Sequence, residues 1–282
     1  MATTTELRPE PVREAGRRVS TRPLAGRLLR PVGWLLRRGT AIVAFLLAWE
    51  FVPRSGLVDR VFLPPLHTVL GAWLALAGNG QLAQHLGASL LRSVTGLALA
   101  VLIAVPLGVL VGWYRPVAEA LNPLLEIFRN TAPLALLPVF VLLLGLGETS
   151  KIALVLFASL WPILLNTVSA VRTVDPLLVR SARSLGLSSL SLFWKVVLPS
   201  ALPTLFTGVR LAVASSIMVL VAAEMMGAKA GLGYLINSAQ FNFQIPQMYA
   251  GILTISLLGL GLNQLLVTLE RRFSRWRAPV SG

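Results

Sequence analysis

Long apolar windows without charged residues recur along the chain. Because a helix rises about 1.5 Å per residue and the hydrocarbon core of a bilayer is about 30 Å thick, one crossing takes roughly 20 mostly apolar residues. A weaker window covers residues 39–57 and carries Glu50 and Pro53 near its far end, where a carboxylate can reach the headgroups. The clear windows lie at residues 94–113, 130–147, 152–171, 211–223 with an extension backward past Arg210, and 249–269. The pattern predicts an all-α membrane protein with six transmembrane helices.

The segments between the windows differ in character. Residues 1–38 are rich in Arg, Pro and Thr and lack a sustained apolar period, which is typical of a disordered tail. We expect this basic tail and a second basic tail at 271–282 to flank one transmembrane domain at 39–270. The longest internal polar segment, 172–203, is too long for a simple turn.

Two further polar segments, 53–91 and 224–248, are expected on the opposite side of the membrane from the long one. Within the first, apolar residues after a Pro-Pro pair recur at helical spacing, which predicts a helix along the membrane interface. Pro133 and Pro138 interrupt the window at 130–147. We therefore expect that helix to enter the membrane with a kink.

Composition and charge support a membrane protein with a defined orientation. Of the 282 residues, 55% are hydrophobic and only 13% are charged, and the mean hydropathy is +0.76. The chain has no cysteine, which excludes disulfides and thiolate metal sites. Its net charge is +14, but the basic residues do not form the stripe on a soluble face that nucleic-acid binding requires. Placing both termini and residues 172–203 in the cytoplasm puts twenty of the 25 basic residues there, as the positive-inside rule demands.

Side chains suited to catalysis or metal binding are sparse. The only histidines, His67 and His85, are eighteen residues apart, and we interpret both as polar residues of the external segment 53–91. The chain lacks the Gly-x-x-x-x-Gly-Lys-Ser/Thr motif that cradles nucleotide phosphates. We therefore expect no catalytic residue, no metal site and no ATP hydrolysis by this chain.

Two polar residues within the windows are candidates for lining a pore. Arg210 can line an anion path, or its long side chain can snorkel to the cytoplasmic face. Asn166 is the second candidate, with an interhelical hydrogen bond as the alternative. The second, third, fourth and sixth windows contain no ionisable residue, whereas carriers driven by protons or sodium keep such groups near the membrane centre. A transporter of this composition must take its energy from a partner.

The long polar segment carries a recognisable spacing. It runs R-S-A-R-S-L-G over residues 180–186, then nine residues, then V-V-L-P over residues 196–199. This resembles the ATPase-coupling motif of ATP-binding-cassette (ABC) importer permeases, E-A-A-x3-G-x9-I-x-L-P. The motif positions are Arg180 in place of the glutamate, Ala182, Gly186, Val196 in place of the isoleucine, Leu198 and Pro199. The pattern predicts two short helices bent at Gly186, the second ending at Pro199 before the fifth span.

The resemblance extends over most of the chain. It is densest at residues 129–138, 147–152 and 221–225, which look like the aliphatic sulfonate, taurine and nitrate permeases of this family. Residues 129–138 are most similar to aliphatic sulfonate permeases. The Trp-Pro pair at 161–162 and residues 193–195 look as much like nitrate permeases, so the resemblance favours a small organic anion and leaves the substrate open among these.

The family implies an architecture and a set of partners. These are the type I importer fold in the bacterial inner membrane, a permease homodimer, two cytoplasmic ATPase subunits that hold ATP-Mg, and an external solute-binding protein. We expect no cofactor on this chain itself. An ion-coupled secondary carrier is the alternative transporter class, and a membrane receptor or assembly scaffold would also have six spans without catalytic residues.

Overall fold

The computed structural model describes residues 39–273, and every regular element within that range is helical. Residues 1–38 and 274–282, which include most of the two expected basic tails, lie outside the described residues. The chain divides into two compact units. The first contributes the apolar helix Gly39–Phe51, and the second is a helical body that begins at Val52.

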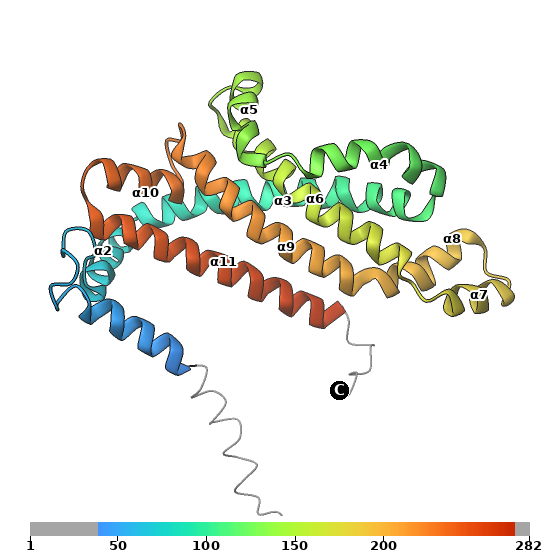
Figure 1. Cartoon of the computed structure of the whole chain (residues 1–282), viewed down its shortest axis with the longest axis horizontal. Helices are drawn as coiled ribbons and strands as arrows, with labels where there is room; N and C mark the ends of the chain where they lie inside the picture. Colours follow the sequence, from blue (N-terminus) through green and yellow to red (C-terminus); the bar gives the residue numbers. More distant parts are fainter. Residues whose placement is uncertain (1–38, 274–282) are drawn as a thin grey trace, which may run out of the picture. The chain divides into compact units, whose positions relative to one another are not determined.

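The helices of the body follow one another with short connections (Figure 1). In chain order they are α2 (Leu66–Gly78), α3 (Gln81–Trp113), α4 (Arg115–Arg129), the 3-10 helix η1 (Pro133–Leu136), α5 (Leu137–Leu144), α6 (Glu148–Arg172), α7 (Pro176–Ser184), α8 (Ser189–Leu192), the π-helix η2 (Phe193–Val197), α9 (Leu198–Met225), α10 (Leu232–Phe241) and α11 (Ile245–Phe273). Within the body, α2 and α10 lie at one end of the long helices, and α7 and α8 lie at the other (Figure 1).

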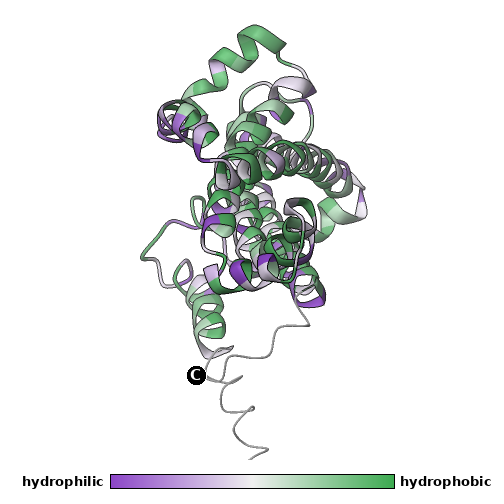
Figure 2. Cartoon of the chain, turned by 90° about the vertical axis from the view of Figure 1, so that its right-hand side faces the viewer, coloured by the Kyte–Doolittle hydropathy of each residue, from purple (hydrophilic) through white to green (hydrophobic). Residues whose placement is uncertain are grey.

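Four of the described helices are long and apolar enough to cross a membrane: α3, α6, the continuous helix Ser189–Met225, and α11. Hydrophobic residues make up much of the helical ribbon (Figure 2). A further apolar pair, α4 with Pro133–Leu144, is bent by 83°, and the helix Gly39–Phe51 is apolar but short. The described residues thus contain four spans, or five if the bent pair is one. Six spans with both termini in the cytoplasm stay a prediction.

Helix α3 begins at Gln81, well before residue 94, where its apolar window starts. Its 33 residues extend about 50 Å, which is longer than the hydrocarbon core. Residues 81–91 of the expected external segment 53–91 are therefore the first turns of α3, and their external placement stays a prediction. The apolar pattern missed these turns because His85 and Arg92 interrupt it, yet both side chains are buried by their neighbours.

Helices α3, α6 and α9 pack along one another and form the core. A Cβ atom on Gly96 of α3 would lie 2.6 Å from Val155, and one on Gly208 of α9 would lie 2.6 Å from Asn166. Such small residues let helix backbones approach closely, as is typical of packing within membranes. The shared apolar core consists of Ala100, Ala104, Ile163, Leu164, Val209 and Ala212.

Proline acts as predicted at one place and differently at another. The predicted kink is confirmed as the 83° bend between α4 and Pro133–Leu144. The prediction that Pro199 ends a helix before the fifth span is wrong, because the helix continues from Ser189 to Met225. Pro199 lies in the first turn of α9, and just before it the N–H of Leu198 bonds to the carbonyl of Phe193 in a wide π turn. Proline has no backbone N–H to donate, but the wide turn just before Pro199 already interrupts the α-helical hydrogen bonds. Pro199 therefore breaks no further bond, and the helix continues.

The close packing of α3 on α6 predicts a specific instability. In Gly108→Ala, the new Cβ would lie 2.7 Å from the Thr167 Cβ and 3.0 Å from the backbone oxygen of Leu164. We expect overpacking to destabilise the protein by about 1–3 kcal/mol. Gly87→Ala on the same helix meets open space and should be neutral or slightly stabilising. Thermal unfolding of both purified variants checks this, and equal midpoints would contradict the packing described here.

Candidate functional site

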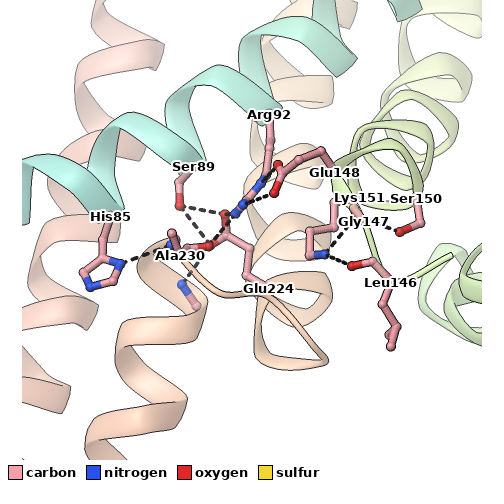
Figure 3. Close-up of polar contacts among 12 residues, drawn as sticks. His85, Ser89, Arg92, Leu146, Gly147, Glu148, Ser150, Lys151, Glu224 and Ala230 are labelled. Atoms are coloured by element: carbon pink, nitrogen blue, oxygen red, sulfur yellow. Dashed lines mark hydrogen bonds and ion pairs between the residues drawn. The ribbon is translucent and has the colours of Figure 1, made fainter.

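Three charged side chains from three helices meet at the α10 end of the body (Figure 3). Arg92 on α3 is 2% exposed, and its Nη1 donates to Glu224 Oε1 on α9 at 2.7 Å. Its Nη2 donates to Glu148 Oε1 at the start of α6 at 2.7 Å, and its Nε donates to the second oxygen of the same carboxylate. Arg92 therefore bridges two carboxylates and binds Glu148 in the two-pronged geometry that suits a guanidinium.

The Glu224 carboxylate is fully buried and accepts two further hydrogen bonds. Ser89 Oγ on α3 donates to it at 2.8 Å, and the backbone N–H of Gly233 in α10 donates at 2.9 Å. Gly231 lies directly against the carboxylate, because a Cβ there would be 2.4 Å from Glu224 Cδ, and its φ is +128°. Only glycine fits this position, for reasons of both space and backbone conformation.

The same face of α3 holds the connection between α9 and α10. Arg92 Nη1 donates to the Ala230 carbonyl at 2.7 Å, and the N–H of Leu232 donates to Ser89 Oγ at 2.8 Å. One turn earlier, His85 Nδ1 accepts the N–H of Gly231 at 3.2 Å. His85, Ser89 and Arg92 are spaced by four and three residues and so share one helical face. His85 and Ser89 accept N–H groups at the start of α10 that have no partner within that helix, while Arg92 donates to the carbonyl just before it.

A second cation completes the cluster. Lys151 on α6 is 4% exposed, and its Nζ donates to the carbonyls of Leu146 at 2.8 Å and Gly147 at 2.9 Å. Lys151 thereby fixes the turn between α5 and α6, and Glu148 follows this turn as the first residue of α6. With Arg92 and Glu224 the cluster contains two basic and two acidic side chains, so that their charges balance when all are ionised. Within residues 39–273, His, Asp and Glu side chains nowhere form a group of three suited to a metal ion. The cluster therefore holds α3, α6 and α9 together through its ion pairs.

The segment with the coupling spacing lies at the opposite end of α9. Gly186 has a φ of +80°, donates its N–H to the Arg183 carbonyl at 2.9 Å, and is followed by a bond from Leu187 N–H to the Ala182 carbonyl at 3.2 Å. This pair of bonds is a Schellman motif, which ends α7 and turns the chain toward α8. The bend at Gly186 after the short helix α7 is therefore present as the spacing predicts, whereas the second helix, α8, is the start of the continuous helix Ser189–Met225. The motif alanine and glycine lie at the two ends of the turn.

The remaining motif positions divide between the core and the surface. Ala182 is buried and Arg180 is exposed, while Val196, Leu198 and Pro199 are half-buried at the start of the long helix. Large apolar side chains nevertheless face outward on this loop: Leu177 (67% exposed), Leu178 (50%), Leu185 (80%), Leu190 (70%) and Trp194 (60%). An exposed apolar surface of this kind, on a loop between helices, is typical of an interaction site.

Neither pore candidate is brought to the buried cluster. Arg210 on α9 forms an ion pair with Glu270 on α11. The amide of Asn166 donates to the Pro162 carbonyl of its own helix at 2.8 Å. A pore-lining role for either residue stays a prediction, and the interhelical hydrogen bond weighed for Asn166 is replaced by this bond within α6.

The sequence patterns did not single out the cluster itself. The apolar pattern places His85 in the external segment 53–91 and assigns Arg92 no role. A signal was present, because Glu148 and Glu224 both lie in the segments of densest resemblance, 147–152 and 221–225. Their meeting in space could not be seen from the sequence.

The cluster predicts unequal roles for its two carboxylates. Glu224→Gln leaves the buried Arg92 without its buried counter-charge, and we expect a loss of about 3 kcal/mol. Glu148→Gln removes a partner that is 62% exposed and should cost at most about 1 kcal/mol. Thermal unfolding, together with trypsin cleavage after Lys229 in the α9–α10 connection, checks this. Faster cleavage in Glu148→Gln than in Glu224→Gln would contradict the assignment.

Comparison with known proteins finds ABC transporter permeases. The chain is 36% identical over 244 residues to the taurine transport system permease protein TauC of Escherichia coli, covering 85% of this chain and 89% of the relative. It is 32% identical over 251 residues to the putative aliphatic sulfonates transport permease protein SsuC of Bacillus subtilis, covering 89% and 90%. It is 31% identical over 264 residues to the bicarbonate transport system permease protein CmpB of a Synechocystis species, covering 84% and 90%.

Solved structures share the fold at low sequence identity. A chain of the inward-facing MetNI methionine ABC transporter superposes with a TM-score of 0.57 and 19% identity, covering 66% of this chain and 93% of that chain. A chain of an amino acid ABC transporter gives a TM-score of 0.54 and 19% identity, covering 71% and 98%.

The family model for the binding-protein-dependent transport system inner membrane component matches residues 104–275, more than half of the chain. This confirms the resemblance drawn from the coupling spacing, and the several apolar helices agree with it. The chain is therefore a multi-pass inner-membrane protein and belongs to the binding-protein-dependent transport system inner membrane components, within the group of ABC importer permeases that includes the taurine and aliphatic sulfonate proteins.

Proposed function

We propose that the chain is the subunit through which an ABC importer moves a small organic anion across the inner membrane, with an aliphatic sulfonate as the first choice. Taurine, nitrate and related small solutes are the alternatives, and bicarbonate joins them because a bicarbonate permease is among the relatives. The relatives named for taurine and sulfonates support a sulfonate group as the common feature.

The segment 172–203, which we call the coupling loop, is the observation that carries this proposal. Arg180, Ala182 and Gly186 form and flank the Schellman turn, while Val196, Leu198 and Pro199 anchor the loop to α9. In our proposal, the exposed leucines and Trp194 contact a cytoplasmic ATPase subunit. Two such subunits hold ATP-Mg and drive the cycle, so that this chain binds no cofactor.

The remaining parts of the assembly follow from the family. We propose that two copies of the chain enclose the pore, with Arg210 and Asn166 as candidates for its lining. An external solute-binding protein would deliver the anion to the α2–α10 end of the body. That end lies about 39 Å from the coupling loop along α9, from Leu198 to Glu224, which is far enough to place the two on opposite sides of a bilayer.

The main alternative, an ion-coupled secondary carrier, is less well supported. Such a carrier needs an ionisable group that is charged and discharged within the membrane. Arg92, Glu148 and Glu224 are instead tied to one another, and Arg210 is paired with Glu270. The relatives are likewise permeases of ABC transporters.

Gly186→Val tests the coupling role. A Cβ at this position meets open space, so the cost is backbone strain alone, about 1–2 kcal/mol at a φ of +80°. We expect a normally abundant permease with roughly tenfold weaker ATPase association and little transport. For ATPase association, Gly56→Val is a matched control, because Gly56 also has a φ of +80° and open space but lies far from the loop in sequence. Arg180→Glu, which restores the family residue, should be tolerated.

Copurification with the ATPase and measured uptake decide between the outcomes. Wild-type association and uptake in Gly186→Val would remove the coupling role from this loop. An equal loss of ATPase copurification in Gly56→Val would show that backbone strain, rather than coupling, weakens the association.

The substrate and the energy source are tested in a clean deletion strain. We expect growth on ethanesulfonate as the sole sulfur source to be lost and to return with the wild-type gene, whereas growth on sulfate is unchanged. Labelled ethanesulfonate uptake should survive a proton uncoupler as long as ATP is maintained, and should fail without ATP. Unimpaired growth on sulfonates would exclude the first-choice substrate, and uptake lost to the uncoupler at constant ATP would favour the secondary carrier.

A further inference from the structure

A basic cavity of about 590 Å³ lies where the segment after Val52, the start of α2 and the start of α11 come together. It belongs neither to the buried cluster around Arg92 nor to the coupling loop. Its lining residues are Arg54, Arg60, Pro64, Pro65, His67, Thr68 and Pro246.

The polar groups of the cavity are mostly cationic or able to donate hydrogen bonds. Arg54 Nη2 lies 3.3 Å from His67 Nδ1, and Thr68 Oγ1 lies 3.3 Å from His67 Nε2, so these three side chains form a chain along one wall. Arg60 Nε donates to the Pro53 carbonyl at 3.4 Å. No carboxylate is among the lining residues. Two guanidinium groups in one cavity match the geometry of phosphate and sulfonate oxygens.

The walls of the cavity are stiff. Pro64 and Pro65 are buried, and Pro65 is the N-cap residue of α2, whose first turn has no acidic side chain. Tyr249 Oη of α11 donates to the Phe62 carbonyl at 3.1 Å and ties the loop to that helix. Fixed proline φ angles and this cross-link hold the loop in place, so that little ordering is needed when a ligand binds.

Several apolar side chains of the same loop are exposed. Leu57 is 80% exposed, Val61 57% and Phe62 66%. Basic groups beside exposed apolar groups are typical of a segment at the membrane–water interface, where the apolar side chains enter the lipid and the charges meet the headgroups.

From these observations we infer that the cavity binds an oxyanion group of the phosphate or sulfonate class. Arg54, Arg60 and Thr68 supply the donors, and His67 orients the first and third of them. Two sources carry this chemistry: the headgroup of an anionic phospholipid, and a free anion from the external solution. The exposed apolar side chains favour the lipid headgroup. Binding there would secure residues 52–65 against the starts of α2 and α11.

The test uses the permease with its ATPase partners in nanodiscs and has one arm for each source. In the first, nanodiscs contain phosphatidylcholine with phosphatidylglycerol, and native mass spectrometry counts the phosphatidylglycerol molecules that remain bound. In the second, nanodiscs contain phosphatidylcholine alone, and calorimetry follows a titration with ethanesulfonate. The variant is Arg54→Gln/Arg60→Gln. The control is Arg115→Gln/Arg129→Gln, which removes the same charge from α4, where both arginines pair with glutamates.

A lipid source predicts that the wild type and the control retain more phosphatidylglycerol than the variant. A free-anion source predicts ethanesulfonate binding that is at least tenfold weaker in the variant than in the control. If the variant equals the wild type in both arms, the inference is wrong. Should the double variant unfold, Arg60→Gln alone replaces it, because Arg60 is exposed and its Nε donates to the backbone carbonyl of Pro53. Neither arm measures transport, so failure here is distinct from failure of the proposed function.

Discussion

A positive charge buried between membrane helices needs a buried negative partner, and the pair of Arg92 and Glu224 meets that need where α3, α9 and α10 join. Most of the local structure depends on this pair. The carboxylate also receives Ser89 and the start of α10, and the guanidinium also binds a loop carbonyl and Glu148 at the start of α6. One ion pair therefore sets the positions of three long helices and of the short helix that follows them.

Features that depend on local spacing could be predicted from the sequence. The apolar windows located α6 and α11, Pro133 predicted the bend after α4, and Gly186 predicted a left-handed turn, because each depends on neighbouring residues alone. The start of α3 and the buried cluster could not be found in this way. A charged residue ends an apolar window whether or not a partner on another helix neutralises it, and the partners of Arg92 are 56 and 132 residues away.

Helix α9 connects the coupling loop with the buried cluster around Arg92. Its first turn carries Leu198 and Pro199 of the coupling spacing, and its last turn carries Glu224. Between them, α9 packs closely on α6 through Gly208 and the shared apolar core. Tight packing of this kind favours movement of the helix as a rigid body over bending. A displacement at the coupling loop would then reach the α10 end without a separate relay of side chains.

The wide turn at Phe193–Val197 affects how the orientation of the coupling loop depends on the number of residues in the helix. A π turn accommodates one residue more than the α-helical pitch, and each residue of an α-helix contributes a rotation of about 100° and a rise of about 1.5 Å. Deleting a single residue here would let the helix wind evenly and would leave α7 and α8 facing nearly the same way, because the wide turn already absorbs the extra residue. A deletion in the regular part of α9 would instead turn the loop around the helix axis by about 100°, so the wide turn is the one place in this helix where a related permease could gain or lose a residue without re-orienting the loop.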